Sequence, residues 1–440
     1  MQGLLPVLMF PALFGLIFLG LPVAFCLLTM GMLFGYAVFG NNIGLQVHGS
    51  LTNLASNFVL VAIPLFIFMG ALLERSQIAE NLLKALRLLL GRFPGGLSVS
   101  TILICALFAA SSGVVGAVEI LVGLMAVPAM VAAGYKKDLI AGSICGGGSL
   151  GTIIPPSVIV VIYASIADLS IGDLFAGILV PGLVMTVGFL AYVVVRCVAH
   201  PQDGPAISED ELDDVSFRDK IWLLFTALLP CFGLILAVIG SIFAGVASPS
   251  EAAAIGSAGA LALTLWYGQF SRRLLSEALE RTVAITAMTL MIMLGGSLFT
   301  NAFMVNGGGG LVRGLLASLE FGPDGTLFLF LGVIFVLGFV LDWASILLIT
   351  VPIFNPVVLS LGIDPVWFAV LVCVVLQTSY LTPPMAPSIF YLQSIASRLI
   401  SLVEMYRGVV PFILVQMLTL FLVYLFPSLA TYMPKVLFRL

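Results

Sequence analysis

Charged side chains are scarce in this sequence, and so are the residues that carry most catalytic and metal chemistry. Of the 440 residues, only 9% are charged and 61% are apolar. A soluble domain carries about 25% charged residues, so this composition indicates a polytopic membrane protein. The net charge of −4 argues against a nucleic-acid partner, and two histidines leave little capacity for imidazole chemistry.

Cysteine pairs and catalytic motifs are also missing. The six cysteines stand singly and mostly in apolar runs, without a CxxC or other metal spacing, so we interpret them as packing residues. Residues 147–151 fit G-x-S-x-G and residues 146–151 fit G-x-G-x-x-G, but neither has the strand context that these motifs need. We therefore expect no cofactor and no enzymatic activity, and the N-terminal apolar run reads as a retained first span in contact with membrane lipids.

Hydrophobicity and a polar connector at 201–220 divide the chain into two halves. We expect the acidic connector to be a solvated cytoplasmic segment rather than a binding site. The expected segments of residues 1–200 are scaffold helices over 4–75 (spans at 4–24, 25–40 and 57–75), an arm at 76–93, a hairpin at 97–133, a broken helix at 137–164 and a span at 174–196. Those of residues 221–440 are scaffold helices over 221–300 (spans at 221–245, 250–268 and 282–300), an arm at 306–320, a hairpin at 325–360, a broken helix at 365–396 and a span at 408–428.

This order of segments is an internal repeat. The pair Pro155-Pro156 recurs 228 positions later as Pro383-Pro384, and each pair interrupts a long apolar stretch. Further along, SIGD at 170–173 matches SLVE at 401–404, and both are capping boxes that open the next helix. Matches that persist along both halves indicate two homologous repeats.

The distribution of positive charge indicates that the repeats are inverted. If the N-terminus is periplasmic and each hairpin enters and leaves on one side, all of the 17 Lys and Arg residues except Arg313, Lys435 and Arg439 become cytoplasmic. This satisfies the positive-inside rule and places the two hairpins on opposite sides of the membrane. The sequence thus predicts a multi-pass membrane protein with both termini periplasmic.

Inverted repeats with discontinuous helices are typical of secondary transporters whose binding site lies at the membrane midplane. The helix that ends near Gly151 and Thr152 offers free carbonyl groups, which suit a bare cation. The half-helix that resumes after Pro156 offers its positive N-terminal end, which suits a carboxylate.

The hairpin tips are rich in oxygen and poor in formal charge, which suits sodium. The first tip carries Ser111, Ser112 and Gly113, although small residues can also serve helix packing alone. The second tip carries Asp342, Trp343 and Ser345. Asp342 is either a ligand, which we favour, or a helix cap. Glu119 is the other acid expected at membrane depth, and its role stays open between function and protonated packing.

The stretches GTIIPPSVIVVIYASIADLSIGDLFAGILVPGL (151–183), FAGVASPSEAAAIGSAGAL (243–261) and LGIDPVWFAVLV (361–372) resemble the large membrane subunit of TRAP transporters, the tripartite ATP-independent periplasmic systems for organic acid uptake. The SPSE motif also has a structural reading, with Ser248 as N-cap, Pro249 at N1 and Glu251 at N3. The resemblance implies an all-α fold of two inverted repeats with re-entrant hairpins and discontinuous helices, which works as an elevator-type ion transporter. It also implies a small four-helix membrane subunit and a periplasmic substrate-binding protein as partners.

The same resemblance implies two sodium sites, and sodium is the only metal expected. The first would use Ser111, Ser112, Gly113, Gly148, Ser149, Gly151 and Thr152. The second would use Gly338, Ser379, Thr382 and Met385, mostly through carbonyl groups, beside Asp342. We expect the substrate at Pro155, Pro156, Trp343, Ser345, Pro383 and Pro384.

The resulting hypothesis is sodium-coupled import of an organic anion. The alternatives are an ion channel or proton-coupled antiporter and, less favoured, an intramembrane enzyme. An antiporter would need paired acids on facing broken helices, and Glu119 and Asp342 do not occupy equivalent positions. An enzyme would need a catalytic constellation that the two histidines do not supply.

Overall fold

The computed structural model describes residues 5–75, 78–112, 116–207, 217–319, 321–383 and 386–438. Within these ranges every regular element is a helix, which confirms the predicted all-α fold. Five of the described helices are long and apolar enough to cross a membrane by themselves, with 18 to 34 residues each.

The described residues of the first half form ten α-helices, one of which, between the second and third predicted spans, was not expected. They are α1 (Leu5–Phe18), α2 (Val23–Phe39), α3 (Ile43–Ala55), α4 (Ala62–Arg75), α5 (Ile78–Leu90), α6 (Gly96–Ser112), α7 (Ala117–Ala132), α8 (Lys137–Ser149), α9 (Val158–Ala167) and α10 (Ile171–Ala199). Here α5 is the arm, α6 and α7 form the hairpin, and α8 and α9 are the two pieces of the broken helix.

The described residues of the second half repeat this order, with three helices instead of four before the arm and one additional helix at the end. Its helices are α12 (Phe217–Phe243), α13 (Pro249–Trp266), α14 (Arg272–Val305), α15 (Gly308–Leu319), α16 (Pro323–Leu337), α17 (Trp343–Ser360), α18 (Pro365–Leu381), α19 (Pro387–Ala396), α20 (Leu402–Leu425) and α21 (Ser428–Phe438). The arm is α15, the hairpin is α16 and α17, and the broken helix is α18 and α19.

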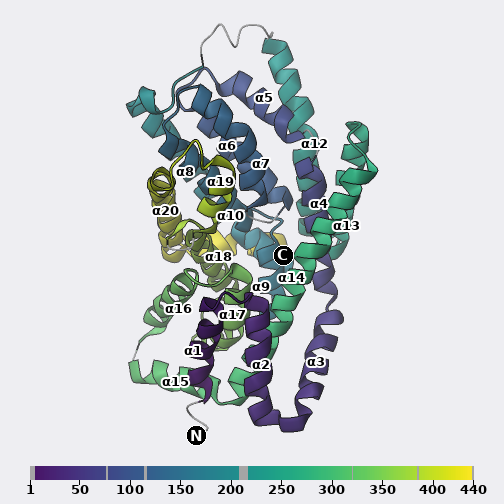
Figure 1. Cartoon of the computed structure of the whole chain (residues 1–440), viewed down its shortest axis with the longest axis vertical. Helices are drawn as coiled ribbons and strands as arrows, with labels where there is room; N and C mark the ends of the chain where they lie inside the picture. The colour runs from purple at the N-terminus through teal and green to yellow at the C-terminus, as the bar shows by residue number, and fades with distance from the viewer. Residues whose placement is uncertain are drawn as a thin grey trace.

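The two repeats point in opposite directions. The arm α5 lies at one end of the long axis and the arm α15 at the other, in the same half of the picture as the N-terminus (Figure 1). The packing has the same internal symmetry, because α2 packs on α14 and α4 packs on α13, the corresponding pair. Likewise α7 of the first hairpin packs on α19, and α17 of the second packs on α9.

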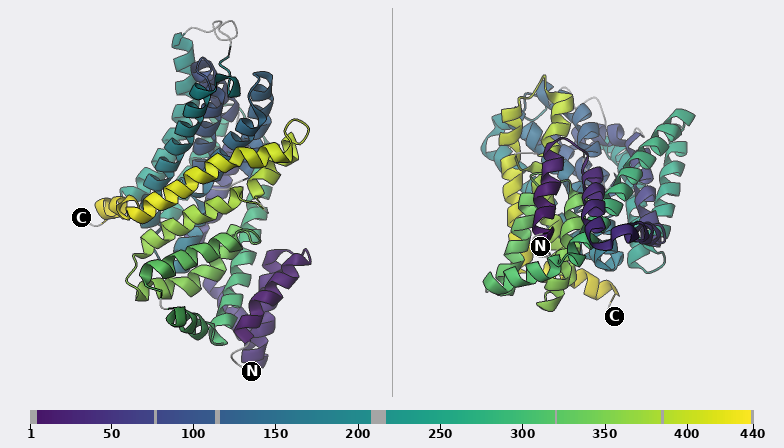
Figure 2. Two further views of the ribbon diagram at one scale, coloured as in Figure 1. Left: turned by 90° about the vertical axis from the view of Figure 1, so that its left-hand side faces the viewer. Right: turned by 60° about the horizontal axis from the view of Figure 1, so that its bottom comes forward.

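The helices fall into two groups that face each other. In Figure 1, α4, α12 and α13 run along one side, and α8, α16 and α20 lie on the other. The turned view in Figure 2 shows α20 crossing the second group obliquely and leading to the C-terminal helix α21, which packs on α10. Hairpins and broken helices thus form one group, and the scaffold helices α1–α4 and α12–α14 form the other.

Serine and aspartate caps fix where several helices begin. Ser170 and Ser401 accept hydrogen bonds from the backbone N–H groups three residues on, as predicted, and Ser401 forms a complete capping box with Glu404. Ser248 and Glu251 form the other predicted box. Since these serines begin α10 and α20 at residues 171 and 402, the predicted span starts at 174 and 408 were too late.

Other predicted spans were also too short. The stretch predicted as a span at 282–300 belongs to α14, which runs for 34 residues from the Ser271 N-cap through the charged segment 271–281. The stretch predicted at 25–40 continues through a 3-10 turn into α3, and α21 was not foreseen. The charged segment predicted the end of a membrane span. The helix nevertheless continues through it, because a helix needs only a cap at its start and unbroken backbone hydrogen bonds along its length.

Candidate functional site

The first helix break is a hydrogen-bonded turn in the protein interior. Helix α8 ends at Ser149 and is followed by a 3-10 turn, η3, at Leu150–Thr152. The Thr152 hydroxyl donates to the Ser149 carbonyl at 3.0 Å, and the Ser157 hydroxyl donates to the Thr152 carbonyl at 2.9 Å. Hydroxyl and carbonyl oxygens thus line a buried break against which α6, the first helix of the hairpin, packs.

The second break lies against the second hairpin. Helix α18 ends with Thr382 as its C-cap, and the Ser379 side chain is buried. At the end of α16, a Cβ placed on Gly338 would lie 2.3 Å from the Ser379 Cβ, so this close approach requires glycine. Each hairpin therefore contacts a break, as the sequence predicts.

Asp342 caps the second helix of the second hairpin. Its carboxylate accepts hydrogen bonds from the backbone N–H groups of Ala344 at 3.1 Å and Ser345 at 3.3 Å, and the Ser345 hydroxyl also donates to it. The prediction that Asp342 is a helix cap is thus confirmed. Its role as a ligand stays a prediction, and it remains compatible with the structure because the side chain also lines the cavity described next.

A cavity of about 520 Å³ separates the two groups of helices. Its volume lies in the range of small-molecule sites. The hairpins and broken helices contribute Gly116, Ile120, Val158, Gly338, Leu341, Asp342, Trp343, Ala344, Ser379, Tyr380, Pro387 and Tyr391. The scaffold contributes Pro22, Val23, Ala24, Arg281, Ile285, Met288, Thr289 and Ile292.

The cavity presents several features that favour an anion. Helices α9 and α19 begin at its wall, with Val158 and Pro387 in the lining, and neither helix has a side-chain cap among the described residues. Their positive N-terminal ends therefore remain open to a ligand. Arg281, which pairs with Glu74 of α4 at 2.5 Å, brings a positive charge to the wall, and Asp342 brings a negative one.

The predicted site residues divide between the cavity and the interior. Gly338, Asp342, Trp343 and Ser379 line the cavity, whereas other predicted residues do not contribute to its wall. Those outside the wall are Gly148, Ser149, Gly151, Thr152, Pro155, Pro156, Ser345, Thr382 and Pro383. Gly113, Pro384 and Met385 lie outside the described residues, as do the side chains of Ser111 and Ser112 at the end of α6.

Several cavity residues were missed by sequence reasoning. Arg281 was assigned to a cytoplasmic segment, and Tyr380 and Tyr391 were not considered. The signal for Arg281 was the Ser271 N-cap followed by more than 20 residues without Gly or Pro, which predicts one continuous helix. Glu119 is fully buried against Gly148, and neither carboxylate oxygen has a hydrogen-bond partner among the described residues.

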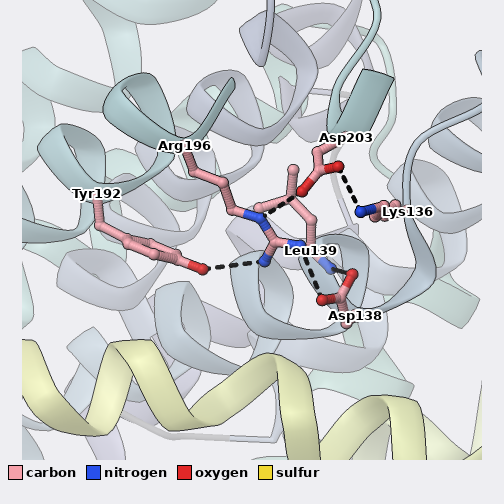
Figure 3. A network of polar contacts seen from close by, with 6 residues as sticks. All are labelled: Lys136, Asp138, Leu139, Tyr192, Arg196 and Asp203. Carbon is pink, nitrogen blue, oxygen red and sulfur yellow. Dashed lines mark hydrogen bonds and ion pairs between the residues drawn. The ribbon is translucent and has the colours of Figure 1, made fainter. Parts of the chain in front are cut away.

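The beginning of the connector is not solvated as expected. Asp203 is only 4% exposed and pairs with Arg196 at 2.9 Å and with Lys136 at 2.6 Å (Figure 3). Arg196 also donates to Asp138 at 2.8 Å. Burial opposes ionisation of Asp203, but the two cations outweigh it and hold its pKa below the ordinary value. This network ties the connector to the start of α8, and residues 208–216 lie outside the described ranges.

The chain matches known transport proteins along most of its length. Residues 10–429 match a family model described as the DctM component of tripartite ATP-independent periplasmic transporters. The C4-dicarboxylate TRAP transporter large permease protein DctM of Pseudomonas aeruginosa is 30% identical over 386 residues, 87% of each chain. The ectoine/5-hydroxyectoine TRAP transporter large permease protein UehC of Ruegeria pomeroyi is 30% identical over 375 residues, 85% of each chain.

A solved structure supports the fold. The YdaH transporter of Alcanivorax borkumensis matches with a TM-score of 0.60 at 18% identity, over 87% of each chain. At this identity the likeness concerns the arrangement of helices and not the substrate.

Proposed function

Because the chain belongs to the DctM family of tripartite ATP-independent periplasmic transporters, we propose that it imports an organic acid anion together with sodium ions. It is the large membrane subunit of a secondary transporter that works with a periplasmic binding protein. In the proposed cycle, hairpins and broken helices slide as one body along the scaffold, which is an elevator movement.

The observation that carries this proposal is the position of the cavity. Its wall combines both hairpin tips and pieces of both broken helices with α14 and the start of α2 from the scaffold. A substrate bound there contacts the moving group and the fixed group at once. Movement of one group would then carry the substrate across the barrier formed by the other.

An anionic substrate is supported by the ends of α9 and α19 and by Arg281. A carboxylate at these helix ends would accept hydrogen bonds from backbone N–H groups that have no side-chain cap. The apolar remainder of the wall, including Trp343 and Ile285, suits the body of a small organic molecule. The two relatives named above are described for a dicarboxylate and for ectoine, so the individual acid does not follow from similarity.

Sodium coupling is supported by the two breaks, where carbonyl and hydroxyl oxygens gather. We place the protein in the bacterial inner membrane with both termini periplasmic. A small four-helix membrane subunit would cover the exposed apolar surface of the scaffold. The periplasmic protein would deliver the acid from the side of the N-terminus.

Uptake into proteoliposomes tests the proposal. The transporter with its small subunit is reconstituted, and the binding protein is added outside with an acid that it binds. We expect uptake to require an inward sodium gradient and to rise when the inside is negative, because each net positive charge gains about 2.3 kcal/mol per 100 mV. Uptake that is equal in sodium and choline would contradict the coupling, and flux without the binding protein would favour a channel.

A further inference from the structure

Three polar side chains meet in the apolar interior where α8, α18 and α20 pack together. Ser149, Gln377 and Gln416 are all fully buried. The Ser149 hydroxyl accepts hydrogen bonds from the amide of Gln377 at 3.2 Å and from that of Gln416 at 3.1 Å, and it donates to the Gly146 carbonyl at 2.7 Å. One hydroxyl thus uses its donor and both acceptor positions.

The contact between Ser149 and Gln377 joins equivalent positions of the two repeats. They are separated by 228 residues, the same offset as the two proline pairs. Ser149 is the last residue of α8 before the first break, and Gln377 lies two residues before Ser379 at the second. The hydrogen bond therefore crosses from one broken helix directly to the other.

Hydrogen bonds and close packing extend this contact to both proposed sodium sites. On one side, the Ser149 carbonyl accepts from Thr152, whose carbonyl accepts from Ser157 beyond the break. On the other side, Gln377 is two residues along α18 from Ser379, which lies against Gly338 of the second hairpin. A displacement of either break is thus passed to the other through bonded groups.

Packing alone does not account for the two glutamines. The side-chain carbonyl oxygens of Gln377 and Gln416 have no hydrogen-bond partner among the described residues. A buried polar atom without a partner costs free energy, whereas an apolar side chain of similar size would fill the space without that cost. What distinguishes the two glutamines from apolar side chains of similar size is that their amide groups donate hydrogen bonds to Ser149.

We propose that Gln377 and Gln416 are positioning residues that hold Ser149 and couple the two breaks, so that sodium at one break raises sodium affinity at the other. This inference rests on the sodium coupling of the proposed function. Thermodynamic linkage makes the effect reciprocal, and a coupling of this kind changes affinity about 5-fold to 150-fold. The two ions would then bind cooperatively before the loaded group moves.

A sodium titration of the purified transporter with its small subunit tests the proposal. Sodium chloride replaces choline chloride at constant ionic strength, and binding is followed through tryptophan fluorescence, since Trp343 lines the cavity. We expect a Hill coefficient above one for the unmodified protein. In Gln377→Leu the Hill coefficient should approach one, and the sodium concentration at half-saturation should rise about fivefold or more. Gln416→Leu should shift the curve in the same direction.

Two further variants separate coupling from general loss of packing. Thr419→Val, on the same helix as Gln416, removes a buried hydroxyl that donates to the Val415 carbonyl, and it should keep the steep curve. In Ser149→Ala the Gln377→Leu change should have little further effect, because the shared partner is already absent. If Gln377→Leu does not fold, Gln416→Leu carries the comparison.

Either of two results would overturn the inference while leaving the proposed function intact. The first is a Hill coefficient of one in the unmodified protein. The second is a sodium titration curve that is as steep in both glutamine variants as in Thr419→Val. A protein that does not respond to sodium at all would contradict the proposed function, and the inference with it.

Discussion

Asp342 accepts hydrogen bonds from the backbone at the start of α17 and is also exposed to the cavity. These two roles respond differently to removal of its charge. Asparagine caps helices about as well as aspartate, so Asp342→Asn keeps the cap and removes only the negative charge. We expect this variant to melt near the unmodified temperature in choline but to lose part of the stabilisation by sodium.

Asp364 provides the matched control for that experiment. It caps α18 through the backbone N–H groups of Val366 and Trp367, and it does not line the cavity. Asp364→Asn should therefore leave the sodium response unchanged. An unchanged sodium response in Asp342→Asn as well would assign Asp342 to helix capping alone.

Arg281 is the cation of the cavity wall. Arg281→Gln removes this charge. We expect the half-saturating substrate concentration for uptake to rise by about tenfold, because one charge-assisted hydrogen bond to the substrate is lost. Arg273→Gln is the control, because Arg273 lies on the same helix but is exposed and pairs with Glu277 of the next turn. Equal uptake kinetics in the two variants would mean that Arg281 serves only the bridge to Glu74.

At the scale of the elements, the contact between α8 and α20 depends on two glycines, Gly142 and Gly408. A Cβ on Gly408 would lie 2.1 Å from the Asp138 carbonyl oxygen, and one on Gly142 would lie 2.3 Å from the Gly408 carbonyl oxygen. Neither backbone can yield locally, because both belong to packed helices. This crossing holds α8, and hence the first break, in its place beside α20.

Gly408→Ala should separate these two helices. Overpacking of this kind costs about 1–3 kcal/mol, which a thermal melt of the purified protein detects. Gly233→Ala is the control, since the added Cβ would meet no described atom within 4 Å beyond its own stretch of helix, and it should leave stability equal or slightly higher. Equal melting temperatures for the two variants would argue against a close crossing at Gly408.

The connector network predicts a dependence of stability on pH. The pKa of Asp203 is lower in the folded protein than in the unfolded chain, so its ion pairs stabilise the fold above the unfolded pKa of about 3.9. This stability is lost as the pH falls through the folded pKa. We expect Asp203→Asn to lower the melting temperature at pH 7, and the difference from the unmodified protein to shrink in acid.

Glu280→Gln is the control, because Glu280 is exposed and accepts a hydrogen bond from Ser276 of the preceding turn. It should have little effect at either pH. A deficit in Asp203→Asn that persists at low pH would show that packing, rather than charge, is what Asp203 supplies.

At the scale of the whole molecule, much of the architecture was predictable from the sequence. The proline pairs, the capping serines and the distribution of Lys and Arg together predicted an all-α fold of inverted repeats. The proline and serine signals worked because each reports a local rule: proline breaks a helix and serine begins one. The sidedness indicated by Lys and Arg stays a prediction.

The missed features depend on contacts between distant residues. In the charged first part of α14, Arg281 pairs with Glu74, which lies 207 residues away in the chain. Hydropathy alone therefore did not predict how long α14 is. Asp203 is buried by partners at 136 and 196, and Ser149 meets Gln416 across 267 residues. Such pairs are decided by how the two groups of helices pack, which no local pattern encodes.

The most direct test of the account is thermal unfolding of the purified protein in sodium against potassium or choline at equal ionic strength. Ser112→Ala and Thr382→Ala, one at each proposed sodium site, are measured beside it. A ligand at 100 times its Kd stabilises the folded state by about 2.7 kcal/mol, which the melt resolves. We predict stabilisation by sodium alone, reduced in both variants. Identical melts in all three cations would contradict sodium binding at the breaks.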